Sequence, residues 1–475
     1  MHKNFVKNCS ALLITALLSA CSTTSFNDLF SNYNQQMRDV KQAQQQGRFQ
    51  EAIESIPSRS SNSSSFNLSM LEKARLEYLA HNNKQSQQDF AEVYQLVQKA
   101  QEAAKIELSR GIENVAAVMS NDNAKRYDIP LYEQSMLNSY QALNYLAQQD
   151  LSSALVEIRR ANLVQQQALK DHASSIHQIQ EDITKQGLGV VDLTGQYPSM
   201  NEAIGRVKNG FQNAYTFYLS AVLYEAAGQY NDAYIDYKKA LEIYPDNRYV
   251  QQEVWRLAVT LNMTDDINLF KSNLSQDITN VKRKKDQGQV VIIVENGIVA
   301  AKREVSVNLP IHTSHNDMRF YSVAIPSYQN HLNVYSPLVI NYQGTSYQAE
   351  EIVRIQSLAA KQLKEQLPAI MIRQVARLIA KEKIREQLAR KGGDIGNIFA
   401  SIYNMATEKA DTRSWSTLPD SIHILKMDLP TGEHQLSLSI NGQKQQLNVS
   451  IDANKTTLVK LTAIGTYLNH QTLYL

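Results

Sequence analysis

The sequence predicts an α+β protein of several domains, with an all-helical superhelix followed by a domain like an antiparallel β-sandwich that carries a helical insertion. Two observations lead to this prediction. Up to about residue 280, small and apolar residues recur at helical spacing between short turns. From residue 288 onward, runs rich in β-branched residues end at Asn-Gly and Pro-containing turns. With 475 residues, 43% of them hydrophobic, the chain is long enough for two to four domains.

The clearest helical unit is the stretch Ala214–Asn247. Its pattern is carried by Phe217, Ala221 and Tyr224, then Gly228 at a turn, then Ala233, Tyr237 and Ala240, and finally Pro245. A helix, a glycine turn and a second helix closed by proline form a hairpin whose apolar face needs a neighbour. The spacing matches W-x2-L-G-x2-Y, A-x3-F and P in register, so the unit resembles a tetratricopeptide repeat (TPR). The eight residues are therefore expected to pack adjacent helices together.

Three earlier segments echo this hairpin, and we expect one TPR-like domain over 35–280. The echoes lie in Asp39–Ile56, Leu71–Val97 and Glu133–Leu169. Because 79 residues separate Ala154 from Ala233, more than two repeats, another helical pair is expected between them. A stack of four to five pairs would leave a concave groove, the usual binding face of such stacks.

A basic pair in this half is a candidate contact for a partner. Arg159 and Arg160 lie off the packed stripe that contains Ala154 and Ile158. Their guanidinium groups suit a carboxylate on a partner protein. The alternative is a solvated helix face on which the arginines pair with Glu157 or Asp150.

The first residues are typical of a secretory signal peptide, assigned here to 1–20. A basic head precedes the apolar run Ala11–Leu18, which is too short to span a bilayer. Leu18-Ser19-Ala20-Cys21 resembles a bacterial lipobox, which implies cleavage between Ala20 and Cys21 and acylation of Cys21. Several acyl chains give a stable anchor. An ordinary signal peptide with an incidental cysteine is the alternative. Residues 21–34 are read as a tether.

The composition of the chain gives no support to disulfides, cysteine-ligated metals or a nucleic-acid partner. The chain has two cysteines, and removal of the signal would leave Cys21 alone, so a disulfide or a cysteine-ligated metal is not expected. Cleavage would remove Lys3 and Lys7 and no acidic residue, leaving 46 basic against 46 acidic residues. A neutral balance gives no argument for nucleic acid as a partner.

The second half, 288–475, is expected to be rich in β-strands. Strands are predicted over Gln289–Glu295, Glu304–Leu309, Arg319–Ile325, Val334–Tyr342, Ser421–Leu429, Gly432–Ile440, Gln445–Ile451 and Thr456–Ala463. Between the two sets lies a helical insertion over 350–409, with helices over Glu350–Leu367, Pro368–Lys391 and Ile395–Lys409. The basic helix 368–391 either packs its apolar side on a sheet or lies on an anionic membrane.

The segment Ala410–Pro419 combines polar and aromatic residues. Asp411 and Arg413 are expected to form an ion pair over Trp415, which fixes the return from helix to sheet or forms a recognition surface. No glycine-rich phosphate loop, serine elbow, His-Glu-x-x-His or paired-cysteine signature occurs. We therefore expect no catalytic residues, no metal site, no cofactor and no enzyme activity.

Taken together, several features resemble a family of proteobacterial TPR-containing outer-membrane lipoproteins that has no assigned activity. They are the lipobox, the hairpins, Val156–Asn162, Gly228–Ala233, Val294–Gly297 and Asp411–Pro419. The family is associated with neighbours of lipoproteins that activate penicillin-binding proteins. The resemblance, with no aspartate after Cys21, implies an outer-membrane lipoprotein on the periplasmic face that binds envelope proteins. Its expected role is to scaffold or regulate a cell-envelope machine, with peptidoglycan synthesis as the leading candidate. The alternatives are a pilotin-like assembly or export factor for an outer-membrane pore, and an envelope glycan-binding or glycan-processing protein.

Overall fold

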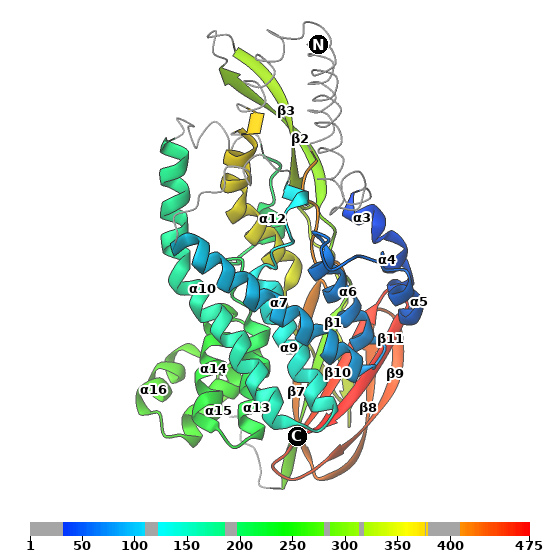
Figure 1. Ribbon diagram of the computed structural model, residues 1–475. Helices are drawn as coiled ribbons and strands as arrows, with labels where there is room; N and C mark the ends of the chain where they lie inside the picture. Colours follow the sequence, from blue (N-terminus) through cyan, green and yellow to red (C-terminus); the bar gives the residue numbers. More distant parts are fainter. Residues whose placement is uncertain are drawn as a thin grey trace, which may run out of the picture.

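The computed structural model describes residues 32–109, 122–185, 197–279, 286–312, 318–375, 377–378 and 409–475. The predicted signal peptide, Ala20, Cys21 and most of the tether lie outside these residues, as does the helix expected over Ile395–Lys409 apart from its last residue. Within the described part the protein is α+β, with helices in the first half and strands in the second, as the sequence predicts (Figure 1).

The helical half consists of consecutive helix pairs. Its helices are α3 (Tyr33–Gln36), α4 (Arg38–Gln45), α5 (Phe49–Glu54), α6 (Phe66–Leu79), α7 (Asn83–Ser109), α9 (Leu131–Ala147), α10 (Leu151–Lys185), α12 (Asn201–Ile204), α13 (Ala214–Ala226), α14 (Tyr230–Ile243), α15 (Arg248–Thr260), α16 (Thr264–Asn273) and α17 (Gln276–Thr279). Short turns join α4 to α5, α6 to α7, α9 to α10, α13 to α14 and α15 to α16. Each pair also contacts the next, which makes a continuous stack.

The same turn joins the helices of all five pairs. Each turn has one residue with positive φ: Gly47, His81, Gln149, Gly228 and Asn262. In each, the next backbone N–H donates to the carbonyl five residues earlier, for example Gln229 to Tyr224 at 2.8 Å and Asp150 to Tyr145 at 2.9 Å. This is the hydrogen bond of a Schellman motif, which satisfies carbonyls at a helix end. At three of the turns the left-handed residue is not a glycine but His81, Gln149 or Asn262. The same helix pair therefore forms even where the sequence has no turn glycine.

The α13–α14 hairpin packs as its sequence pattern predicts. Ala221, Ala233 and Ala240 are fully buried, and Phe217, Tyr224 and Tyr237 are nearly so. Gly228 takes φ +73° at the turn, and Pro245 lies exposed beyond the last residue of α14. The rings of Tyr218 and Tyr237 meet edge to face, with centroids 5.5 Å apart. Small side chains therefore let the two helices approach closely.

The helical pair expected between Ala154 and Ala233 is not found in the residues described between these two positions, 154–185 and 197–233. Helix α10 instead runs without a turn for 35 residues, from Leu151 to Lys185. Only the four-residue α12 follows in the described part before α13 begins. The long helix α10 thus accounts for much of the extra spacing.

The strands form a mixed sheet, a smaller sheet and a hairpin. They are β1 (Gln287–Asn296), β2 (Arg303–His312), β3 (Met318–Ser327), β4 (Val339–Tyr342), β5 (Thr345–Gln348), β6 (Glu350–Arg354), β7 (Ser421–Pro430), β8 (Gly432–Ile440), β9 (Gln443–Ile451), β10 (Thr456–Ile464) and β11 (Tyr467–Tyr474). The five-stranded sheet has the order β11-β10-β1-β7-β6, and the four-stranded sheet has the order β5-β4-β8-β9. Since β1 pairs in parallel with β10, the prediction of a purely antiparallel sandwich was wrong.

Two boundaries of the predicted insertion also differ from the structure. Residues 350–354 form β6, which pairs with β7, and the helix begins only at 355. This helix then continues through Pro368 to 375, so Pro368 does not begin a new helix. The helix packs on the β2–β3 hairpin in a small separate core of Val307, Val323, Ile325, Met371, Val375 and Leu378. The expected packing of its apolar side on a neighbouring sheet is therefore confirmed for the described part.

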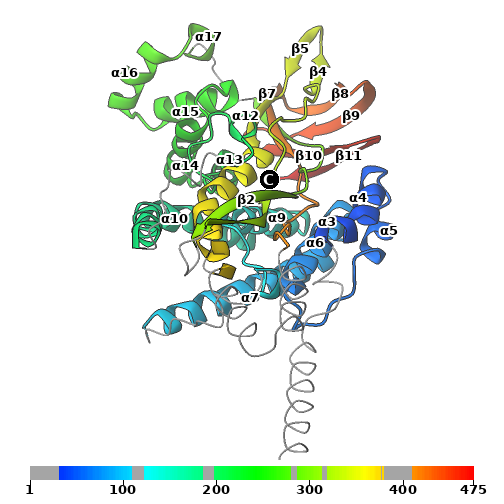
Figure 2. The same ribbon diagram turned by 90° about the horizontal axis from the view of Figure 1, so that it is seen from above.

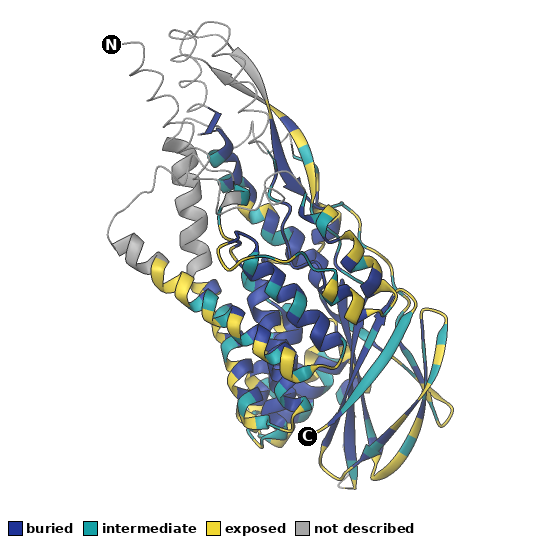
Figure 3. Ribbon diagram, turned by 45° about the vertical axis from the view of Figure 1, so that its right-hand side comes forward, coloured by how far each residue is buried: buried dark blue, intermediate teal, exposed yellow. Residues whose placement is uncertain are grey.

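The helical and strand-rich halves share one hydrophobic core. A single cluster of buried side chains extends from Tyr33 in α3 to Leu473 in β11. Strand β1 lies at its centre and is buried at every position after Gln287. Because strand side chains alternate between faces, both faces of the sheet are covered around β1. The helical stack covers one side, and β9 of the smaller sheet contacts β1 and β10 (Figures 2 and 3).

Candidate functional site

The inner face of the helical stack is filled by the chain's own strands. Every residue from Tyr132 to Asn144 in α9 is buried, and so is every residue from Ala214 to Glu225 in α13. Helices α13 and α15 contact β6 and β7 directly. The groove in which a stack of this kind usually holds a partner is therefore closed by the five-stranded sheet.

Charged side chains join the stack to this sheet. Arg75 of α6 donates through Nη2 to Oε2 of Glu295 in β1, at 2.6 Å, and both side chains are buried. Tyr140 of α9 donates to the other oxygen of Glu295 at 2.9 Å. A second buried ion pair links Glu253 of α15 to Lys426 of β7. These pairs fix how the helices lie on the sheet.

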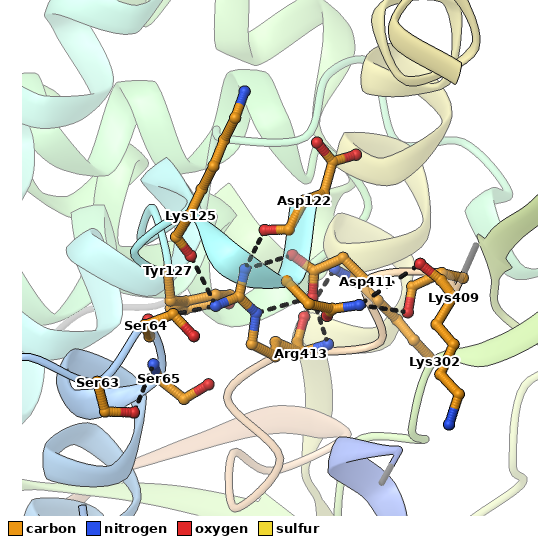
Figure 4. A network of polar contacts seen from close by, with 12 residues as sticks. Ser63, Ser64, Ser65, Asp122, Lys125, Tyr127, Lys302, Lys409, Asp411 and Arg413 are labelled. Carbon is orange, nitrogen blue, oxygen red and sulfur yellow. Dashed lines mark hydrogen bonds and ion pairs between the residues drawn. The ribbon is translucent and has the colours of Figure 1, made fainter. Parts of the chain in front are cut away.

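The segment 409–420, which we call the strap, returns the chain to β7 beneath the helices. Arg413 is its most connected side chain (Figure 4). Its guanidinium donates to both carboxylate oxygens of Asp411, at 2.9 and 2.7 Å, and to the carbonyl oxygens of Ser64, Lys125 and Asp122, at 2.9 to 3.2 Å. Burial raises the pKa of Asp411, but the Arg413 charge outweighs it and holds that pKa below its ordinary value.

Two buried glutamates hold the backbone of the strap. Glu72 of α6 accepts the backbone N–H groups of Ser416 and Thr417 at 2.7 and 2.9 Å. Glu133 of α9 accepts the N–H of Trp415 at 3.1 Å and the hydroxyl of Tyr127 at 2.9 Å. The helices thus bind the strap much as they would bind a peptide from another chain. The role of these two residues could not be predicted from the sequence, since a glutamate within a helix usually faces solvent.

The ion pair expected between Asp411 and Arg413 is present, but the aromatic ring beside it is different. The guanidinium carbon of Arg413 lies 5.6 Å from the ring centroid of Tyr127. Trp415 has no exposed surface and packs against Phe90 and Tyr140. A partner could reach Arg413 or Trp415 only if the strap left its place, so we do not include the strap in the binding face proposed below.

The two candidate arginines on α10 have different surroundings. Arg160 donates to Glu157 at 2.7 Å, and its guanidinium carbon lies 4.4 Å from the ring centroid of Tyr94. Arg159 is exposed, makes a long hydrogen bond to Gln229 at 3.4 Å, and has its guanidinium carbon 5.7 Å from the ring centroid of Tyr224. Arg160 therefore contributes to packing, as the alternative interpretation holds, whereas Arg159 is open to solvent.

Arg159 lies within an exposed apolar stripe on α10. Val156 is 44% exposed and Leu163 is 63% exposed, and the two flank Arg159 at helical spacing. Residues three and four apart share one helix face, so the three side chains form one surface. A single exposed leucine is ordinary, but an arginine between two exposed apolar residues is the composition that protein interfaces favour.

No metal centre or membrane span is found in the described residues. Among them, no group of three or more His, Cys, Asp or Glu side chains could hold a metal ion. No described helix is both long enough and apolar enough to cross a bilayer. Comparison with models of known protein families finds no match, and comparison with curated proteins finds no relative.

Because the Glu133 carboxyl group is buried, we expect the stability of the folded protein to depend on pH. Burial raises its pKa from 4.5 to about 7, against the opposing effect of its hydrogen bonds. The folded state then holds the proton more tightly, so this group's stabilisation is complete below about pH 4.5 and is lost as the pH rises to about 7. The expected loss is about 3 kcal/mol. In urea unfolding at several pH values, Glu133→Gln should flatten the decline between pH 5 and 7. The exposed Glu92→Gln should not, and an unchanged slope in Glu133→Gln would contradict the assignment.

Proposed function

We propose that this protein is a lipid-anchored scaffold of the bacterial cell envelope. Acylated Cys21 tethers it to the outer membrane, with the folded part in the periplasm, and TPR-like helix pairs present a face to a partner protein. The partner belongs to a cell-envelope machine, with peptidoglycan synthesis as the leading candidate. The lipobox around Cys21, the recurring helix pairs and the lack of catalytic motifs in the sequence support this proposal.

The exposed stripe on α10 is the observation that carries the proposal furthest. The inner face of the stack is occupied by the sheet and the strap, so a partner meets the outward face of the helical layer. On that face Val156, Arg159 and Leu163 combine apolar area with an arginine whose charge has no carboxylate partner among the described residues. Arginine is one of the residues that most often dominate the binding energy of an interface, and the side chains around it help by excluding water.

A site-specific crosslinking experiment tests the proposal. A photoreactive amino acid placed at Val156 of the full-length protein in its own membranes should capture one protein partner. The variants Arg159→Glu and Leu163→Asp should each lower the yield about tenfold, as expected when an interface residue worth 1–2 kcal/mol is lost. The matched controls are the photoreactive residue at Gln435, exposed on β8, and the variant Gln435→Glu, which should leave capture at Val156 unchanged.

The anchor is tested separately by Cys21→Ser. That variant should leave the membrane fraction, while the native protein should yield an N-terminal peptide that begins at an acylated Cys21 in mass spectrometry. A native chain that still begins at Met1 would refute the anchor. Capture of no protein at Val156, or equal capture by the Arg159 and Leu163 variants, would refute the binding face.

A further inference from the structure

Strand β11 forms one edge of the five-stranded sheet, and among the described residues no strand lies beyond it. It pairs with β10 over all eight of its residues, from Tyr467 to Tyr474, without a shift in register (Figure 1). An edge strand has a row of backbone N–H and C=O groups that point away from the sheet and can pair with another strand. Such an edge can bind a second strand unless the protein protects it.

Every second residue of β11 directs its backbone groups away from β10. The N–H of Leu475, just after β11, donates to the carbonyl oxygen of Thr456 in β10 at 2.9 Å, so the odd-numbered residues face β10. The outward-facing positions are Leu468, His470, Thr472 and Tyr474. Among the described residues, their outward backbone groups form one hydrogen bond, from the N–H of His470 to Oδ1 of Asn469 at 2.8 Å. The rest of this row is available to a second strand.

The other edge strands of the two larger sheets have features that discourage strand pairing. Strand β6 carries Glu350 and Glu351, and its register shifts at a bulge. Strand β5 is only four residues long, and β9 carries Lys444. Short strands, charged side chains and bulges are the usual protections of an edge. Strand β11 contains no Asp, Glu, Lys, Arg or Pro and no bulge, and burial lowers the pKa of His470, so its imidazole is neutral at pH 7.

The outward-facing residues of β11 are complementary to a second copy of themselves. If two copies pair in antiparallel with Gln471 of one opposite Gln471 of the other, Leu468 of each lies opposite Tyr474 of the other, and His470 lies opposite Thr472. Each of these facing pairs can exchange two backbone hydrogen bonds. Tyr474 is 64% exposed, and an aliphatic side chain opposite an aromatic one stabilises a strand pair. This register thus uses every outward-facing residue of both strands.

The contacts between the helices and β11 leave room for this pairing. The ring of Phe49 in α5 lies edge to face on that of Tyr467, with centroids 4.8 Å apart, and Nε2 of His81 lies 3.1 Å from Nδ2 of Asn469. Both contacts are at the start of β11. In the antiparallel pair the two Tyr467 residues would be eight positions apart along the strands, about 27 Å. The helices above each start therefore lie at opposite ends of the pair.

We propose that two copies of this protein associate through β11 into a two-fold dimer in which the two five-stranded sheets become one. A second copy suits this edge because a two-fold axis places the same surface against itself, and β11 brings no charged residues together there. The dimer surface contains none of the residues of the α10 stripe, so it is independent of the partner-binding face proposed above.

Single cysteines test both the dimer and its register. They are placed in the full chain with Cys9 and Cys21 replaced by serine, so the result does not depend on the lipid anchor. In Gln471→Cys the two thiols lie at the axis, where facing Cα atoms are about 4.5 Å apart, within the range that a disulfide spans. Mild oxidation should crosslink most of this variant. Tyr474→Cys is the matched control, because its thiol is more exposed but lies about 20 Å from its copy, six positions along the strands.

Sedimentation equilibrium of the full chain supplies an independent test. The protein should be dimeric at micromolar concentrations. Thr472→Pro removes an N–H that points outward, which an edge strand tolerates, so the monomer should keep its native circular dichroism. Because one hydrogen bond is lost from each copy, this variant should dimerise at least about tenfold more weakly. Thr472→Val keeps the N–H and the side-chain shape and should dimerise like the native protein.

Three results would overturn the proposal. The first is a monomer at every concentration, which would leave the edge to a strand from a different protein. The second is crosslinking of Tyr474→Cys that equals or exceeds that of Gln471→Cys, which would point to random collision or another register. The third is an undiminished dimer in Thr472→Pro, which would place the contact elsewhere on the molecule.

Discussion

Replacing Arg75 with methionine should lower the free energy of unfolding by about 3–5 kcal/mol, because it leaves the buried carboxylate of Glu295 without its counter-ion. The guanidinium is fully buried and lies against two rings, with its carbon 5.0 Å from the centroid of Tyr78 and 4.5 Å from that of Tyr140. The charge of Lys460 also interacts with Glu295, but burial lowers the pKa of Lys460 to about 7. A partly neutral lysine replaces the lost charge poorly. Urea unfolding followed by tryptophan fluorescence measures the change.

The double variant Arg75→Met with Glu295→Gln is the informative control. It removes both charges and keeps an acceptor for the Tyr140 hydroxyl, so it should be more stable than Arg75→Met alone. Arg206→Met removes an exposed ion pair, that of Arg206 with Asp246 at 2.8 Å, and should cost less than about 1 kcal/mol. If Arg75→Met cost no more than Arg206→Met, the buried pair would not fix the helices to the sheet.

Replacing Trp415 with alanine should cost about 3–5 kcal/mol, the usual range for a large aromatic residue removed from a core. Its indole N–H donates to the Thr417 hydroxyl at 3.1 Å, and its ring lies 5.8 Å from Phe90 and 6.0 Å from Tyr140, centroid to centroid. Removal of the indole ring would open a cavity between the strap on one side and helices α7 and α9 on the other. Limited proteolysis should then cut within 409–420 in the variant before it cuts the native protein.

Trp415→Phe keeps a ring in the same place and should cost less than Trp415→Ala. Tyr230→Ala removes an aromatic side chain that is about half exposed and should have little effect. Because Tyr140 contacts both Arg75 and Trp415, the effects of changing these two residues together should not be additive. Equal stability of Trp415→Ala and Tyr230→Ala would show that the strap is not part of the core.

Local structure could be predicted well from the sequence because its signals are local. The hairpin Ala214–Asn247 and the strand of Gln289–Glu295 have strong periodicity and clear turn residues, and both are present. Strand β11 was missed, since Tyr467–Tyr474 mixes polar and apolar residues and most of its positions are only half buried. The break expected at Pro368 is absent, because a proline lowers the stability of a helix without always ending it.

The long-range arrangement could not be predicted in the same way. The parallel pairing of β1 with β10 joins Gln289 to Thr456, and nothing in either strand specifies a partner so far away. Glu72, Arg75 and Glu133 lie within helices, where charged residues normally face water, and their burial follows only from the strap and the sheet that cover them.

The pairing of β1 also determines when the fold can be completed. Both neighbours of this central strand, β7 and β10, come from the last 55 residues of the chain. During synthesis from the N-terminus, the helices can pair locally as they emerge, but β1 has no partner until more than 420 residues have been made. A chain with such distant pairings folds slowly, and its apolar helix faces stay exposed meanwhile. Chaperones that bind unfolded chains can therefore bind this protein until its C-terminal strands have been synthesised.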